Sequence, residues 1–86
     1  MERILIIEDD TDLLEGLIFA LESEGYETRA AQTMKEGLKL LKEGGSLVLL
    51  DCNLPDGSGF DLCVQAKKLQ DIPILMLTAR DTEMDE

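Results

Sequence analysis

The sequence predicts an α/β domain in which helices cover both faces of a parallel sheet. Short apolar runs of four or five residues alternate along the chain with amphipathic stretches of helical period. Glycine and proline separate most of these segments. The resulting order, β-α-β-α-β-α-β, is typical of a parallel sheet with crossover helices. The 86 residues suit one small domain, residues 1–86, with no room for a second one.

The first strand and the first helix are predicted at the start of the chain. Residues 3–7 form an almost continuous apolar run, which is typical of a strand that is buried on both faces. Leucine and isoleucine then recur at helical spacing over residues 13–21. Gly25 follows this stretch and is the expected C-terminal stop of the helix.

A second strand–helix pair follows. Residues 26–31 predict a weaker and more polar strand, as expected at the edge of a sheet. Thr33 and Glu36 match a capping box, so a second helix is expected to open there. Gly44 and Gly45 are expected to end it.

The second half of the chain continues the alternation. Residues 47–50 predict a third buried strand, and Ser58 is expected to cap a third helix. Pro73 introduces a fourth apolar strand at residues 74–77. Residues 81–86 are acidic and are expected to open another helix, because carboxylates favour the first helical turn.

The segment between Asp51 and the third helix is rich in turn residues. Pro55, Gly57 and Gly59 are expected to shape a turn that clears Asp51 and starts the next helix. Asp56, at the centre of this segment, is expected to be an ordinary turn residue.

Composition limits the possible functions. The net charge of −11 argues against direct contact with nucleic acid, which needs clustered cations, and suits a cation, a basic protein surface or solubility. The chain has no histidine, which excludes histidine acid–base chemistry and most zinc sites. Cys52 and Cys63 are expected to be reduced core thiols, with a disulfide or a metal pair as the alternative. Without a signal peptide or a long apolar run, we expect a cytoplasmic protein.

Polar groups gather where three of the predicted strands end. Glu8, Asp9 and Asp10 follow the first strand, Asp51 ends the third, and Thr78 ends the fourth. The carboxyl ends of parallel strands meet at one rim of the sheet, which is where ligands bind in such folds. Clustered carboxylates repel one another unless a cation such as Mg²⁺ is bound between them. The acidic residues after the first strand also fit a helix N-cap with a solvated surface.

Three motifs resemble those of a known family. "ILIIEDD", "LLDCNLPDGSG" and "IPILMLTARD" are similar, in this order and spacing, to the receiver domain of bacterial response regulators, and the similarity covers the whole chain. The resemblance implies a flavodoxin-like, doubly wound parallel sheet of order 2-1-3-4-5. It also implies a signalling phosphoacceptor, which takes a phosphoryl group from a sensor histidine kinase and is not an enzyme in the usual sense. A DNA-binding output domain outside this chain is implied by the family alone.

The resemblance implies a role for each matched residue, which physical chemistry supports. An aspartate can attack phosphorus only if a cation offsets the combined negative charge. The roles are Asp51 as phosphoacceptor and metal ligand, Asp9 as direct Mg²⁺ ligand, Glu8 as its neighbour acting through water, Asn53 as a backbone carbonyl ligand, Thr78 as the switch hydroxyl, Ala79 as a backbone amide near the phosphoryl group, and Asp10 as helix cap.

The sequence departs from the family at its C-terminal side. The family has five strands and five helices, whereas this chain stops after the predicted fourth strand, without the fourth helix, fifth strand and fifth helix. The lysine that ends the fifth strand in the family is also missing, so we expect phosphorylation and dephosphorylation to be impaired. The strand at 74–77 would be an exposed apolar edge, and we expect self-association through this edge or through swapped elements.

Two other function classes remain open. The first is a module that keeps the fold, takes no phosphate and only mediates association or dimerisation. Such a module would not need phosphoryl transfer or Mg²⁺. An Mg²⁺-dependent aspartyl-phosphate hydrolase of the haloacid dehalogenase type would also use a strand-end aspartate. Such a hydrolase usually has a second aspartate two residues after the nucleophile, where this chain has Asn53.

Overall fold

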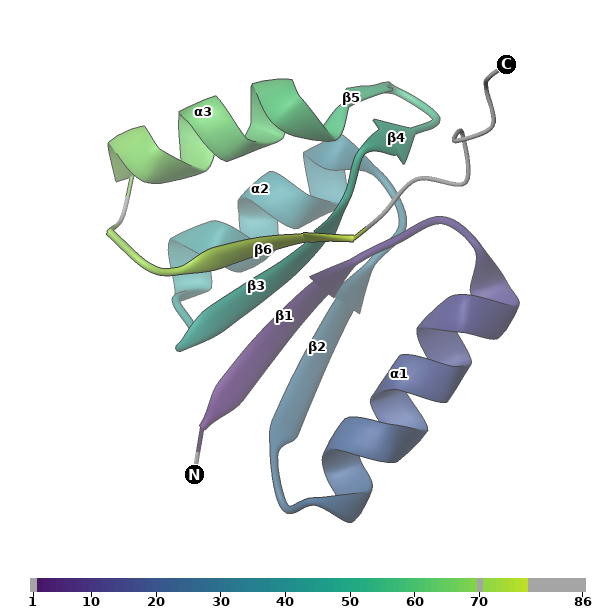
Figure 1. Ribbon diagram of the computed structural model, residues 1–86. Coiled ribbons are helices and arrows are strands. Elements are labelled where there is room, and N and C mark those ends of the chain that lie inside the picture. Colours follow the sequence, from purple (N-terminus) through teal and green to yellow (C-terminus); the bar gives the residue numbers. More distant parts are fainter. Residues whose placement is uncertain (1, 70, 78–86) are drawn as a thin grey trace.

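The computed structural model describes residues 2–69 and 71–77 (Figure 1). Thr78, Ala79 and the helix expected at 81–86 therefore lie outside the described residues. The described elements are β1 (Arg3–Ile7), α1 (Thr11–Ser23), β2 (Glu27–Ala31), α2 (Met34–Glu43), β3 (Leu47–Asp51), β4 (Asn53–Leu54), β5 (Gly57–Ser58), α3 (Gly59–Leu69) and β6 (Ile74–Leu77).

The main sheet confirms the predicted topology. Its four strands are parallel and lie in the order β2-β1-β3-β6, so the predicted fourth strand is β6. This is the 2-1-3-4 part of the expected order, and β2 is an edge strand as predicted. The register places Ile7 beside Leu50 and Asp51 beside Leu77. The carboxyl ends of β1, β3 and β6 consequently meet at one rim of the sheet.

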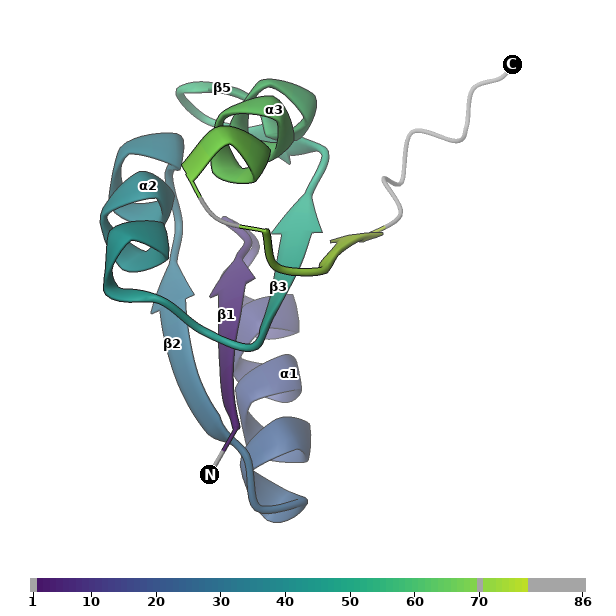
Figure 2. The same cartoon turned by 90° about the vertical axis from the view of Figure 1, so that its left-hand side faces the viewer.

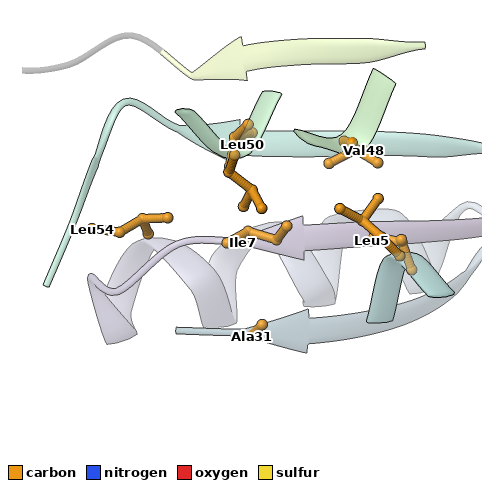
Figure 3. Packing of buried hydrophobic residues seen from close by; sticks show 9 residues of the cluster. Leu5, Ile7, Ala31, Val48, Leu50 and Leu54 are labelled. Carbon is orange, nitrogen blue, oxygen red and sulfur yellow. The ribbon is translucent and has the colours of Figure 1, made fainter. Parts of the chain in front are cut away.

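Helices cover both faces of the sheet, as the alternating pattern predicted. Helices α2 and α3 lie on one face and α1 lies on the other (Figures 1 and 2). Successive side chains of a strand point to opposite faces, so β1 divides its residues between the two cores. Leu5 and Ile7 pack toward α2 and α3 (Figure 3), whereas Ile4 and Ile6 pack with Leu14 of α1. Strand β1 is thus buried on both faces.

The helix ends follow the capping signals closely. Thr33 is the N-cap of α2, and its hydroxyl accepts a hydrogen bond from the Glu36 amide at 3.1 Å. The Glu36 carboxylate accepts from the amide of Gln32 at 3.2 Å, so it reaches one residue beyond the usual capping box. Gly25 and Gly44 follow α1 and α2 with φ of +94° and +92°, which favours glycine.

The sequence did not predict the short antiparallel hairpin that follows Asp51. Strands β4 and β5 pair Asn53 with Ser58 and Leu54 with Gly57. The Ser58 hydroxyl then accepts from the Phe60 amide at 3.1 Å, which confirms the expected cap at the start of α3.

The structure also describes the two cysteines and the lengths of the helices. Cys52 and Cys63 are half-buried and form no disulfide with each other. Within residues 2–69 and 71–77, none of the helices has the length and apolar character needed to cross a membrane.

Strand β6 lies at the end of the sheet opposite β2. It pairs with β3 on one side, and no strand of the described chain pairs with its other side. Its apolar residues are only partly covered, and the Leu75 side chain is 57% exposed. This matches the apolar edge expected from the sequence.

Candidate metal centre

Three carboxylates from two neighbouring strands meet at the carboxyl rim of the sheet. Glu8 and Asp9 directly follow β1, and Asp51 is the last residue of β3. The Glu8 amide extends the sheet by donating to the Ala31 carbonyl at 3.0 Å, which fixes the backbone at this position. One carboxylate oxygen from each of the three residues lies within 4.8 Å of the other two.

Two of these carboxylates are removed from water. Glu8 and Asp51 are each only 1% exposed, whereas Asp9 is exposed. The Glu8 Oε2 atom accepts a hydrogen bond from the Asp10 amide at 2.9 Å. Asp51 Oδ2 is buried and has no hydrogen-bond partner among the described residues. An unpaired oxygen of this kind is costly and calls for a functional explanation.

The electrostatics of the cluster favour a positive charge within it. Burial raises the pKa of the Glu8 carboxyl, and the hydrogen bond from the Asp10 amide lowers it. The negative charge of Asp51, a side-chain hydrogen bond with Asp51 and the negative charge of Asp9 raise this pKa further. The cluster is therefore unfavourable when all three groups are ionised. A divalent cation bound here would offset the repulsion and would be a partner for the Asp51 oxygen.

The donor set fits Mg²⁺. This ion prefers oxygen ligands and binds to proteins through one or two carboxylates while it keeps several waters. Asp51 and Glu8 supply buried oxygens, and Asp9 supplies an exposed one. The three members of the cluster offer only carboxylate oxygens, so its chemistry suits a hard cation.

The remaining predicted residues fall into separate groups. Asp10 is the N-cap of α1 and accepts from the Leu13 amide at 3.3 Å, as expected. The backbone of Asn53 begins β4, two residues after Asp51. Thr78 and Ala79 follow β6 directly and lie outside the described residues, so their roles stay predictions.

The segment after Asp51 is held against two other parts of the molecule. A Cβ atom on Gly59 would overlap the Asp51 carbonyl oxygen, so only glycine allows this close approach. The Gly59 amide donates to the Cys52 carbonyl at 2.8 Å. At the hairpin tip, the Asp56 carboxylate accepts from the amides of Met34 and Lys35 at 2.7 and 3.2 Å.

Asp56 is the residue whose role the sequence did not reveal. It was expected to be a turn residue, but its side chain also caps the N-terminus of α2. These hydrogen bonds lower the pKa of the Asp56 carboxyl, the bond from Met34 most of all. No local signal could identify the interaction, because its partners lie more than twenty residues earlier in the chain.

Fold and site together define a class of protein: a doubly wound α/β domain with a candidate acidic metal site at the ends of its parallel strands. Residues 4–86 match the sequence profile described as the response regulator receiver domain. The chain belongs to this family, whose members are signalling domains of two-component systems. The family assignment expected from the three sequence motifs is thereby confirmed.

Relatives and solved structures agree with this assignment. The chain is 44% identical to the transcriptional regulatory protein BasR of Escherichia coli K12 over 86 residues, which is 98% of this chain and 39% of BasR. The non-phosphorylated HemR receiver domain from Leptospira biflexa superposes with a TM-score of 0.87 and 43% identity, covering 93% of this chain and 66% of that one.

A third match comes from a complex of the histidine kinase ThkA with the response regulator protein TrrA. The TM-score is 0.86 at 34% identity, over 100% of this chain and 76% of the matched chain. The curated relatives are much longer: this chain spans 39% of BasR and 38% of the sensory transduction protein RegX3 of Mycobacterium tuberculosis.

Proposed function

We propose that this chain is the phosphoacceptor module of a two-component response regulator and that Asp51 accepts the phosphoryl group. The observation that supports this most is the buried, unpartnered Asp51 oxygen within reach of two further carboxylates. Evolution rarely leaves a buried carboxylate unsatisfied without a functional reason.

The proposed reaction is a displacement at phosphorus. A carboxylate oxygen of Asp51 attacks the phosphorus atom of a phosphohistidine, the P–N bond breaks as the new P–O bond forms, and the histidine nitrogen leaves with the bonding electrons and takes up a proton. When bound, Mg²⁺ supplies the positive charge that offsets phosphoryl and carboxylate oxygens. Asp9, Asp51 and the Asn53 carbonyl would hold the ion directly, and Glu8 would act through water.

Phosphorylation would then act as a switch. An acyl phosphate adds strong acceptor oxygens and negative charge at the rim of the sheet. In the proposed switch, the Thr78 hydroxyl donates a hydrogen bond to a phosphoryl oxygen and the Ala79 amide does so from the backbone. Movement of the segment after β6 would bias a two-state element and transmit the signal.

The proposed partners follow from the family and the charge. TrrA was solved with a histidine kinase, and BasR is a transcriptional regulatory protein. By analogy, we assign a sensor histidine kinase as phosphodonor, a DNA-binding output domain beyond this chain, and a cytoplasmic location. The net charge of −11 suits a module that does not itself contact DNA. Self-association would use the open edge of β6.

The direct test is chemical phosphorylation. The protein is incubated with a small phosphodonor such as acetyl phosphate, with and without Mg²⁺, and its intact mass is measured. We expect one phosphoryl group that is stable in acid, labile in base and dependent on Mg²⁺. Asp51→Asn should abolish the mass shift, whereas Asp61→Asn, which removes an exposed carboxylate from the first turn of α3, should not.

The other outcomes identify the alternatives. Persistence of the mass shift in Asp51→Asn would contradict the assignment of the phosphoacceptor. Steady release of phosphate over many turnovers would favour the hydrolase. Absence of any shift, with the fold intact, would favour a module that only mediates association.

A further inference from the structure

The hairpin that follows Asp51 is too short to hold its own shape. It consists of two residues in β4, two in β5 and a two-residue connection between them. A two-stranded hairpin is marginal in water even when it is longer. Its position must therefore be set by contacts with the rest of the molecule.

Contacts at both ends supply this support. At the base, the Leu54 side chain is 8% exposed and belongs to the core beneath α2 and α3, and the Gly59 amide bonds to the Cys52 carbonyl. At the tip, the Asp56 carboxylate bonds to the amides of Met34 and Lys35. The tip is exposed. Besides these two hydrogen bonds, the Met34 side chain lies against Gly57, so the carboxylate is the polar part of its attachment to α2.

The N-terminus of α2 is well suited to hold a carboxylate. The first amides of a helix have no partner within the helix and carry part of the positive end of its dipole. In α2, Asp56 accepts from Met34 and Lys35, and the Thr33 hydroxyl accepts from Glu36. The two capping side chains therefore share one helix end, but only Asp56 ties that end to the loop of the metal site.

We propose that Asp56 is a positioning residue for the metal centre. Its carboxylate ties the hairpin to the N-terminus of α2, and the hairpin bears the Asn53 carbonyl. This inference rests on the proposed function, in which that carbonyl is a metal ligand. Asp56 does not touch the ion. Asp56 acts by holding β4 in place, so that the Asn53 carbonyl already has a fixed position when Mg²⁺ binds. Removal of such support around a metal site typically costs ten- to a hundredfold in affinity.

A matched pair of variants tests this inference. Asp56→Ala removes the cap together with the tether, whereas Thr33→Ala removes a cap from the same helix end and leaves the tether intact. Each protein is unfolded thermally at increasing MgCl₂ concentrations, and the dissociation constant follows from the ligand-dependent stabilisation. We expect both variants to lose stability without metal. Only Asp56→Ala should bind Mg²⁺ more weakly, by roughly tenfold.

A third variant covers the possibility that Asp56→Ala fails to fold. Asp56→Asn keeps one acceptor oxygen and should show an intermediate Mg²⁺ affinity. Equal affinities in Asp56→Asn, Thr33→Ala and the unaltered protein would overturn the positioning role, while phosphorylation of the unaltered protein at Asp51 would still support the proposed function. If the unaltered protein shows no Asp51-dependent Mg²⁺ binding, the proposed function and the positioning role both fail.

Discussion

Replacement of Asp51 by asparagine should make the metal-free protein more stable while it abolishes phosphoryl transfer. Asp51 and Glu8 are both 1% exposed, and their carboxylate oxygens lie within 4.8 Å of each other. Two unit charges at this separation repel by roughly 3 kcal/mol at the effective dielectric constant of protein sites. The introduced asparagine side chain would carry no charge and could donate a hydrogen bond to the Glu8 carboxylate.

We expect the net gain to be smaller than this repulsion, because the buried asparagine amide also needs hydrogen-bond partners. An unsatisfied buried oxygen typically costs about 1–3 kcal/mol, and we expect a gain in this range for Asp51→Asn. For a domain of this size, each 1 kcal/mol raises Tm by about 4–8 °C. Mg²⁺ should make the unaltered protein the more stable of the two. At a concentration of a hundred times its dissociation constant, the ion stabilises the unaltered protein by about 2.7 kcal/mol.

The assay is urea unfolding at neutral pH, followed by far-UV circular dichroism in EDTA and in MgCl₂. Asp61→Asn is the control, because it removes one negative charge from an exposed position. Asp51→Asn should be the more stable protein in EDTA and should respond little to Mg²⁺. The reasoning from buried repulsion would be refuted if Asp51→Asn were less stable than the unaltered protein in EDTA. It would also be refuted if Mg²⁺ stabilised both proteins equally.

Three further predictions concern the loop, its tether and the sheet edge. Gly59→Ala should lower the free energy of unfolding by about 1–3 kcal/mol, because the added Cβ atom would overlap the backbone. Gly16→Ala, in an open position of α1, should raise the free energy of unfolding by about 0.5–1 kcal/mol. Urea unfolding measures both effects. The pKa of the Asp56 carboxyl is lowered in the folded state. The unaltered protein should therefore be more stable than Asp56→Asn by the full difference above the unfolded-state pKa of about 3.9, and this difference should disappear as the pH falls through the folded-state pKa. Leu75→Lys should reduce self-association in sedimentation velocity, since charge on an edge strand opposes pairing.

Each of these predictions has an outcome that contradicts it. Equal stability of the two glycine variants would mean that the loop can move away from β3 without cost. A constant difference between the unaltered protein and Asp56→Asn down to low pH would show that the carboxylate charge is not what caps α2. Self-association that is unchanged in Leu75→Lys, with Phe19→Lys on α1 as the exposed control, would place the contact elsewhere.

Local chemistry allowed most of the fold to be predicted. The apolar run of β1 predicted a strand buried on both faces, and Thr33, Gly25 and Gly44 marked helix ends because caps act within a few residues. The parallel order followed from the alternation of strands and helices. That order alone brings the ends of β1 and β3 together, so the pairing of Glu8, Asp9 and Asp51 was also predictable.

The tertiary structure decided what depends on contacts between distant segments. Asp56 looked like a turn residue, yet its partners are the first amides of α2, and no local pattern records a hydrogen bond between a loop and an earlier helix. The raised pKa of Glu8 and the unpaired oxygen of Asp51 likewise arise only once folding excludes water from these side chains. The sequence by itself determined which groups meet at the site, because strand order follows from local pattern. Their burial, charge state and support were decided by packing, because desolvation and long-range hydrogen bonds exist only in the folded chain.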